Sequence, residues 1–113
     1  MLSDKKIGFI GGGQMGEAIF SGIVASGEVK AADVHVTDIS AGRLEQLHEK
    51  YGVTTHLNDD ANTGALEIVK TADIVVFAVK PQFARPVLAG VSGAFRPQQL
   101  VVSIMGGITL DFL

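Results

Sequence analysis

Short runs of apolar residues alternate along this chain with longer stretches in which apolar side chains recur at helical spacing. Runs of the first kind predict strands, and stretches of the second kind predict helices. Strands are predicted at Lys6–Ile10, Asp33–Asp38, Val53–His56, Ala72–Val79 and Leu100–Ile104. Helices are predicted at Gln14–Ala25, Ala41–Tyr51, Ala61–Lys70 and Gln82–Gly93. Strand and helix therefore alternate over the whole chain.

The hydrophobic pattern also predicts how these elements are buried. The run Ala72–Val79 is apolar almost throughout, which is typical of a strand that a parallel sheet buries on both faces at its centre. The stretch Ala41–Tyr51 has Leu44 and Leu47 on one face, so it predicts a surface helix. Gly64 weakens the prediction of the helix that contains it. On the last of these helices, the spacing places Phe83, Val87 and Val91 on the buried side.

This alternation predicts an α/β fold, a Rossmann-type doubly wound parallel sheet. Right-handed crossovers give the strand order 3-2-1-4-5. In such a sheet a ligand lies beyond the carboxyl ends of the strands, where the strand order reverses, and Gly11–Gly16 and Lys80–Gln82 flank that crevice. The chain is predicted to be one domain, residues 1–113, in which Thr109 is the N-cap of a further helix that begins at Leu110–Leu113.

Three glycines between the first strand and the first helix have the spacing GxGxxG. Gly11 allows a tight turn with positive φ, Gly13 lets a ligand approach the backbone, and Gly16 lets the helix pack closely on the strand. The helix N-terminus, with its unpaired N–H groups and the positive end of the helix dipole, favours the pyrophosphate of a dinucleotide. A strand, this turn and a helix in succession therefore predict nucleotide binding. A glycine-rich turn that serves packing alone is the alternative.

Asp38 ends the second predicted strand, about 20 residues beyond the last glycine of the turn. A carboxylate at this place commonly accepts hydrogen bonds from the ribose hydroxyls of adenosine and repels a 2′-phosphate, which favours NAD over NADP. The alternative is a solvated aspartate that caps the following turn. Arg43 lies close by in sequence and is able to reach a 2′-phosphate, so the choice between NADPH and NADH stays open.

Two further loops are predicted to face the cofactor. Lys80 follows the most apolar strand and precedes Pro81, so its ammonium group can donate to the nicotinamide ribose or to the pyrophosphate. A lysine that ends a strand and reaches for water is the alternative. Met105, Gly106 and Gly107 follow the last strand, where glycine lets a nicotinamide ring approach closely.

Composition limits the partners of such a site. The 113 residues have a net charge of −3 and no cluster of Lys and Arg, which argues against nucleic acid or an anionic membrane as the main partner. Cysteine is absent and the three histidines lack metal-ligand spacing, so no metal site is predicted. His35 is interpreted as a partly buried structural residue. The lack of a signal segment and of a membrane-spanning run predicts a cytoplasmic location.

No pattern in the chain predicts a catalytic side chain. Neither a Ser-His-Asp arrangement nor a pair of carboxylates in a defined pocket can be recognised. Hydride transfer needs no side-chain nucleophile, because the cofactor carries the chemistry and the protein supplies position and electrostatics.

Three segments together resemble the N-terminal half of pyrroline-5-carboxylate reductases. They are IGFIGGGQMGEAI at Ile7–Ile19, FAVKPQ at Phe77–Gln82 and VVSIMGGIT at Val101–Thr109. The first is shared with many β-hydroxyacid-type dehydrogenases, whereas the other two are more specific. The resemblance implies an oxidoreductase that reduces L-1-pyrroline-5-carboxylate to L-proline with NADPH or NADH, the last step of proline synthesis.

The resemblance also implies which residues bind the cofactor. It implies pyrophosphate contacts for Ile10, Gly11, Gly12, Gly13, Gln14 and Met15, and contacts around the adenosine ribose for Ile39 and Ser40, the residues that follow Asp38. It implies that Ala78, Val79, Lys80 and Pro81 line the cofactor, that Ile104, Met105 and Gly106 lie near the nicotinamide, and that Asn58 corresponds to an asparagine that contacts adenosine.

The chain departs from the family in residues and in length. The family commonly has alanines where this chain has Met105 and Gly106, and NADPH-preferring members have small or amide residues where it has Asp38. Family members continue into a helical C-terminal domain that forms a homodimer or larger assembly and supplies most of the substrate site. The chain is therefore expected to be truncated before that domain, to contain no catalytic residue and to bind cofactor at best. The alternatives are a β-hydroxyacid-dehydrogenase-type reductase and a non-catalytic nucleotide-sensing domain.

Overall fold

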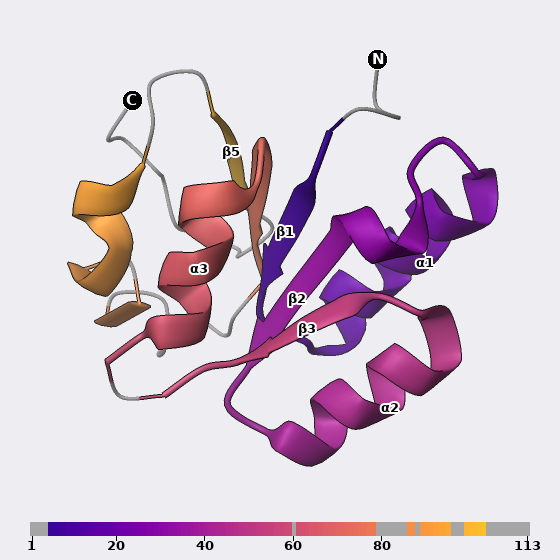
Figure 1. Ribbon diagram of the computed structural model, residues 1–113, viewed down its shortest axis with the longest axis horizontal. Coiled ribbons are helices and arrows are strands. Elements are labelled where there is room, and N and C mark those ends of the chain that lie inside the picture. Colours follow the sequence, from indigo (N-terminus) through magenta and orange to yellow (C-terminus); the bar gives the residue numbers. More distant parts are fainter. Residues whose placement is uncertain (1–4, 60, 79–85, 88, 96–98, 104–113) are drawn as a thin grey trace.

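The computed structural model describes residues 5–59, 61–78, 86–87, 89–95 and 99–103. Within them, parallel strands form one sheet in the order β3-β2-β1-β4-β5, with helices on both faces (Figure 1). The strands are β1 (Ile7–Ile10), β2 (Val34–Asp38), β3 (Thr54–Leu57), β4 (Ile74–Phe77) and β5 (Leu100–Ser103). The helices are α1 (Gln14–Ser26), α2 (Ala41–Tyr51) and α3 (Thr63–Thr71), and residues 86–87 and 89–91 are also helical. The predicted α/β fold and strand order are confirmed.

Both faces of the sheet are buried because side chains alternate along its inner strands. On the face that α1 and α2 cover, Phe9 of β1 packs with Phe20 and Leu47. On the opposite face, the next residue of β1, Ile10, packs with Ile68 of α3. β4 behaves in the same way, since Val76 belongs to the first of these cores and Val75 and Phe77 belong to the second. The predicted burial of this strand on both faces is confirmed, although β1, its neighbour, is the middle strand.

Gly64 is required at its position in α3, although the sequence made it a weak point of that helix. A Cβ atom on Gly64 would lie 2.5 Å from Thr37 Oγ1 and 2.7 Å from the Leu57 carbonyl oxygen. Gly8 of β1 is similarly placed, because its Cβ would lie 2.2 Å from Ile68 Cγ2. Because Gly8 and Gly64 have no side chains, α3 can pack directly on the sheet.

The helix α3 begins two residues later than the sequence predicts. Asp59 Oδ1 accepts hydrogen bonds from the backbone N–H groups of Ala61 (3.1 Å) and Thr63 (3.0 Å). Asn62 takes a left-handed conformation with φ of 56° as the N-cap of the helix. Because of these contacts, residues 61 and 62 belong to the turn and not to the helix. Asp and Asn side chains often favour a turn over a helix in this way, since they bond to nearby backbone N–H groups.

Two of the three side chains predicted on the buried face of the helix after β4 are described. Val91 is buried and Val87 is half-buried against the α3 core, which confirms that face. Phe83 and the helix predicted after Thr109 lie outside the described residues. None of the helices in the described ranges combines the length and hydropathy needed to cross a membrane.

Candidate functional site

A pocket of about 490 Å³ lies at the carboxyl ends of β1, β2 and β4. Its volume is in the range typical of small-molecule sites. The strand order reverses beside β1, so the pocket coincides with the predicted crevice. The described residues that line it are Ile10, Gly11, Gly12, Gly13, Thr37, Asp38, Ile39, Asn58, Asp59, Asn62, Ala78, Pro86 and Val87.

The glycine turn forms the floor of this pocket between β1 and α1. Gly11 has φ of 113°, and its N–H donates to the Thr37 carbonyl oxygen at 2.9 Å, so the predicted tight turn is confirmed. A Cβ on Gly16 would lie 3.2 Å from the Gly11 carbonyl oxygen and 3.3 Å from Ala78 Cβ, which confirms the predicted close packing of the helix. Both positions therefore need glycine for reasons internal to the fold.

Gly13 differs from its neighbours because no packing contact explains it. It is the N-cap of α1 with an ordinary extended backbone, and no side chain caps the helix there. It is exposed, and a Cβ added to it would meet nothing within 4 Å. The space in front of the α1 N-terminus is thus free for a ligand, and the unpaired N–H groups of a helix start favour an anionic one.

Asp38 connects the glycine turn to the loop after β2. Its Oδ2 accepts from the Gly12 N–H at 2.9 Å, and its Oδ1 accepts from the Ser40 N–H at 2.9 Å. A Cβ on Gly12 would lie 3.2 Å from Oδ2, so the close approach depends on glycine. The carboxylate caps its own turn, as one reading of the sequence predicted, and it also lines the pocket.

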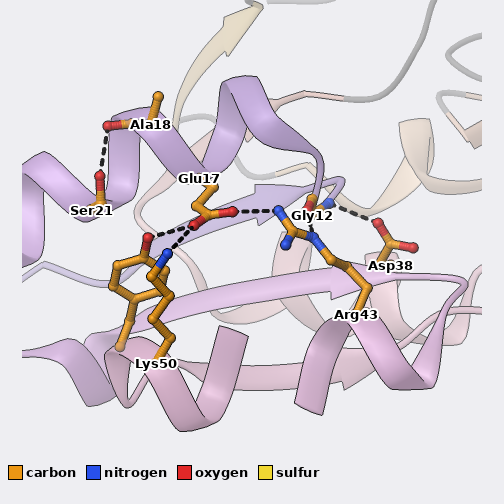
Figure 2. A network of polar contacts seen from close by, with 8 residues as sticks. Gly12, Glu17, Ala18, Ser21, Asp38, Arg43 and Lys50 are labelled. Carbon is orange, nitrogen blue, oxygen red and sulfur yellow. Dashed lines mark hydrogen bonds and ion pairs between the residues drawn. The ribbon is translucent and has the colours of Figure 1, made fainter. Parts of the chain in front are cut away.

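Arg43 lies beside the turn but does not point into the pocket. Its Nε donates to the Gly12 carbonyl oxygen at 2.6 Å, and its Nη2 donates to Glu17 Oε1 at 2.5 Å (Figure 2). It is absent from the pocket lining in the described part of the chain. The guanidinium therefore ties the start of α2 to the glycine turn and to the first turn of α1.

Glu17 is the centre of a polar network between α1 and α2 (Figure 2). Besides Arg43, its carboxylate accepts from Tyr51 Oη at 2.5 Å and from Lys50 Nζ at 3.3 Å. The hydrogen bond from Tyr51, then that from Arg43, lowers the pKa of Glu17 to about 2. Sequence reasoning did not single out Glu17. An acid in the first turn of one helix and bases in the next are a signal for such a contact, but only packing shows that they meet.

The opposite rim of the pocket comes from the loop between β3 and α3. Asn58 is buried, its Oδ1 accepts from the Ala65 N–H at 3.0 Å, and its Nδ2 donates to Asn62 Oδ1 at 3.2 Å. Asn58, which the resemblance predicts to contact adenosine, thus also holds this loop against the start of α3. Asp59 and Asn62 line the pocket beside it.

The structure brings together about half of the residues predicted to bind cofactor. Those that line the pocket are Ile10, Gly11, Gly12, Gly13, Asp38, Ile39, Asn58 and Ala78. Gln14 and Ser40 are exposed next to it but do not line it, and the Ser40 hydroxyl instead accepts from the Arg43 N–H as the N-cap of α2. The side chain of Met15 is not described, and Val79, Lys80, Pro81, Ile104, Met105 and Gly106 lie outside the described residues.

Five lining residues were missed: Thr37, Asp59, Asn62, Pro86 and Val87. Thr37, Asp59 and Asn62 carry a signal, because they lie at or just beyond the carboxyl ends of β2 and β3, and parallel strands end at the same edge of the sheet. Nothing in the sequence distinguishes Pro86 and Val87, which reach the pocket through the tertiary arrangement. The ionisable groups in the described lining are the carboxylates of Asp38 and Asp59. In its described part, the pocket therefore offers binding groups rather than an evident acid and base pair.

The histidines lie away from this pocket. His35 Nδ1 and His56 Nε2 are hydrogen bonded at 2.8 Å, and their rings stack with centroids 5.1 Å apart. Both are half-buried, which agrees with the structural role predicted for His35. His48 Nδ1 donates to the Val53 carbonyl oxygen at 2.9 Å. Among the described residues no group of three potential ligands is placed to hold a metal ion.

Known proteins resemble this chain over nearly its whole length. A family model described as NADP oxidoreductase, coenzyme F420-dependent, matches residues 6–107. Pyrroline-5-carboxylate reductase of Escherichia coli (strain K12) is 40% identical over 110 residues, which are 97% of this chain and 39% of that protein. The chain thus spans about two fifths of the length of the curated relatives that it matches.

Solved structures give the same result. A pyrroline-5-carboxylate reductase from Coxiella burnetii is 36% identical with a TM-score of 0.78, and the match covers 93% of this chain and 37% of that one. Plasmodium falciparum pyrroline carboxylate reductase, solved with NADP bound, is 27% identical with a TM-score of 0.75, and the match covers 96% of this chain and 36% of that one. These similarities confirm the resemblance inferred from the sequence segments.

Proposed function

Because the chain belongs to the family described as NADP oxidoreductase, coenzyme F420-dependent, we propose that it is the cofactor-binding part of a pyrroline-5-carboxylate reductase. The reaction is the reduction of L-1-pyrroline-5-carboxylate to L-proline with NADPH or NADH. One observation carries the proposal: the pocket behind the glycine turn lies within a chain that resembles these reductases over 97% of its length. The family description alone is broader than this reaction.

The open space in front of Gly13 supports the fit of a dinucleotide to this site. In the proposal the pyrophosphate lies at the α1 N-terminus, held by residues Ile10, Gly11, Gly12, Gly13, Gln14 and Met15. Asp38, Ile39 and Ser40 border the adenosine ribose, and Asn58 borders the adenosine. Ala78, Val79, Lys80 and Pro81 line the cofactor, and Ile104, Met105 and Gly106 lie nearest the nicotinamide.

The bound nicotinamide would supply the hydride, which adds to the carbon of the substrate C=N bond while a proton adds to its nitrogen. This chain's part is to bind and orient the cofactor, and the residues that bind the imino acid and deliver the proton are proposed to lie outside these 113 residues. The proposal includes a cytoplasmic location and assembly of the complete protein into a homodimer or larger oligomer.

The test uses the complete product of the gene that encodes this chain. With pyrroline-5-carboxylate present, we expect NADH or NADPH to be oxidised and proline to accumulate in equal amounts. Cofactor oxidation with a β-hydroxyacid but not with the pyrroline would favour the β-hydroxyacid-dehydrogenase type of reductase. Tight binding of cofactor without oxidation by either substrate class would favour a nucleotide-sensing domain.

A further inference from the structure

We propose that this chain selects NADH over NADPH, because Asp38 presents a fixed carboxylate to the pocket while Gly12 and Glu17 hold the Arg43 guanidinium away from it. The inference rests on the proposed binding of a nicotinamide dinucleotide in this pocket and adds which of the two cofactors is preferred. NADPH carries a phosphate on the 2′ position of the adenosine ribose, where NADH has a hydroxyl. Charges at the end of β2 therefore decide between them.

The Asp38 carboxylate is fixed and still has acceptor capacity. The Gly12 and Ser40 N–H groups hold one oxygen each at 2.9 Å, so the side chain cannot rotate away without losing both contacts. An ionised carboxylate has about four acceptor positions, which leaves about two for further donors. Ribose hydroxyls are such donors. A 2′-phosphate near neutral pH carries a charge of about −1.5 to −2 and is repelled by the carboxylate.

Arg43 is the cation nearest in sequence that would reverse this preference, and its guanidinium has other partners. Its Nε and Nη2 donate to the Gly12 carbonyl and to Glu17, at 2.6 and 2.5 Å. The Gly12 carbonyl group and the Glu17 carboxylate lie on the side of the glycine turn that faces α2 (Figure 2). Arg43 does not belong to the described pocket lining. Turning the guanidinium into the pocket would break an ion pair whose acid is only 18% exposed.

Glu17 is itself anchored, so it is not free to follow Arg43. Tyr51 and Lys50 of α2 both donate to its second carboxylate oxygen, at 2.5 and 3.3 Å. The acid is therefore held between two helices by groups on both of its oxygens. Glu17 acts as a positioning residue for Arg43 and makes no contact with the pocket in the described lining.

The test compares the dissociation constants of NADH and NADPH for the 113-residue chain by titration calorimetry at a fixed ionic strength. We expect NADH to bind about tenfold more tightly or better, which corresponds to about 1.4 kcal/mol. In Asp38→Asn the ratio should fall by a similar factor, mainly through stronger NADPH binding. Circular dichroism checks that the variant keeps its fold.

Two further variants separate the roles. Glu17→Gln should release Arg43 and strengthen NADPH binding while NADH binding stays nearly unchanged. If Glu17 only supported the fold, the substitution would weaken the binding of both cofactors together. An unchanged ratio of the two dissociation constants would overturn the role of Arg43. Glu49→Gln removes one negative charge from an exposed position of α2 and serves as the charge-matched control. A shift there as large as in Asp38→Asn would overturn the assignment to Asp38.

The failures of the two proposals give different results. If neither cofactor binds the wild-type chain, the proposed cofactor-binding function is contradicted. If both bind and NADPH binds as tightly as NADH or more tightly, the function stands and the inferred selectivity is wrong.

Discussion

Single glycines determine how close the chain comes to itself and to a ligand at the pocket. Gly11 supplies a left-handed φ, Gly12 allows Asp38 to approach its backbone, and Gly16 allows α1 to approach β1. Gly13 satisfies no such internal need, because a side chain there would extend into open space. At the scale of the residue, therefore, Gly11, Gly12 and Gly16 serve the fold through close contacts or a left-handed φ, whereas the described contacts give Gly13 no such role.

Replacing Gly13 by valine should abolish measurable binding of NADH and NADPH while the fold is kept. The backbone there has φ of −76°, which valine tolerates, and the new side chain would occupy the space in front of the helix N-terminus. Gly22→Val is the matched control, since Gly22 is an exposed position of the same helix with nothing within 4 Å of its Cβ. Unchanged affinity in a folded Gly13→Val chain would contradict the role of the turn.

The positions of α2 and α3 depend on contacts with other elements. α3 lies on β2 and β3 because Gly64 has no side chain, and α2 is joined to α1 through Glu17. Phe20 of α1 also stacks edge-to-face on Tyr51 of α2, with centroids 5.4 Å apart. The first contact fixes α3, whose N-cap Asn62 lines the pocket, and the other two fix α2 against α1, which begins at the pocket.

Gly64→Ala should destabilise the chain by about 1–3 kcal/mol, because the added methyl group would overlap Thr37 Oγ1 and the Leu57 backbone. Gly42→Ala, at an exposed position of α2 with free space around it, should stabilise by roughly 0.5 kcal/mol through helix propensity. Urea unfolding of both variants measures the difference. Equal effects of the two substitutions would show that α3 does not pack as closely as described.

Tyr51→Phe should lower stability at neutral pH by about 1–2 kcal/mol, because it removes a hydrogen bond to an ionised group. The pKa of Glu17 is lowered from 4.5 to about 2, chiefly by the Tyr51 hydroxyl, so its contribution is complete above about pH 4.5 and is lost as the pH falls toward 2. The variant should therefore lose less stability than the wild type over that window. Parallel stability curves for the two proteins would rule out the coupling.

The sheet of this molecule also carries an acid-sensitive pair of histidines, His35 and His56. His35 on β2 and His56 on β3 form a hydrogen bond that joins the edge strand to its neighbour. Burial lowers the pKa of both rings, and the charge of His56 lowers that of His35 further. Lys6 acts in the same direction on His35, while Asp33 and Glu67 oppose it.

Stability should fall in two stages as the chain is acidified. Because the folded pKa values of the two histidines lie below the ordinary 6.5, their contribution is complete above that value and is lost as the pH falls below it. The second stage follows below about pH 4.5, where Glu17 is protonated, and Asp59, whose pKa the Thr63 N–H lowers, contributes to the same stage. Urea midpoints measured from about pH 7.5 to about pH 5.5 should decline in the wild type and decline less in His56→Gln. A steeper or equal decline in that variant would exclude the pair as the cause.

Pattern and spacing were enough to predict the strands found in the described residues and their order, because strands that alternate with helices form a doubly wound parallel sheet with right-handed crossovers. They also located the pocket, since strand ends and the glycine turn fix where a ligand can enter. The boundary of α3 was wrong because Asp59 and Asn62 form a capped turn. Local competition of this kind is not visible in hydrophobic periodicity.

The sequence by itself thus determined the layers, the glycine turn and the presence of Asp38 at the end of a strand. Only the tertiary structure decided what the charged groups do there. Asp38 and Arg43 are both plausible ribose-side residues in sequence, but Arg43 turns toward Glu17, on a helix 26 residues earlier, and Asp38 toward the pocket. Local pattern determines which elements form because it acts over a few residues. The partner of a charge is chosen by packing between elements far apart in the chain.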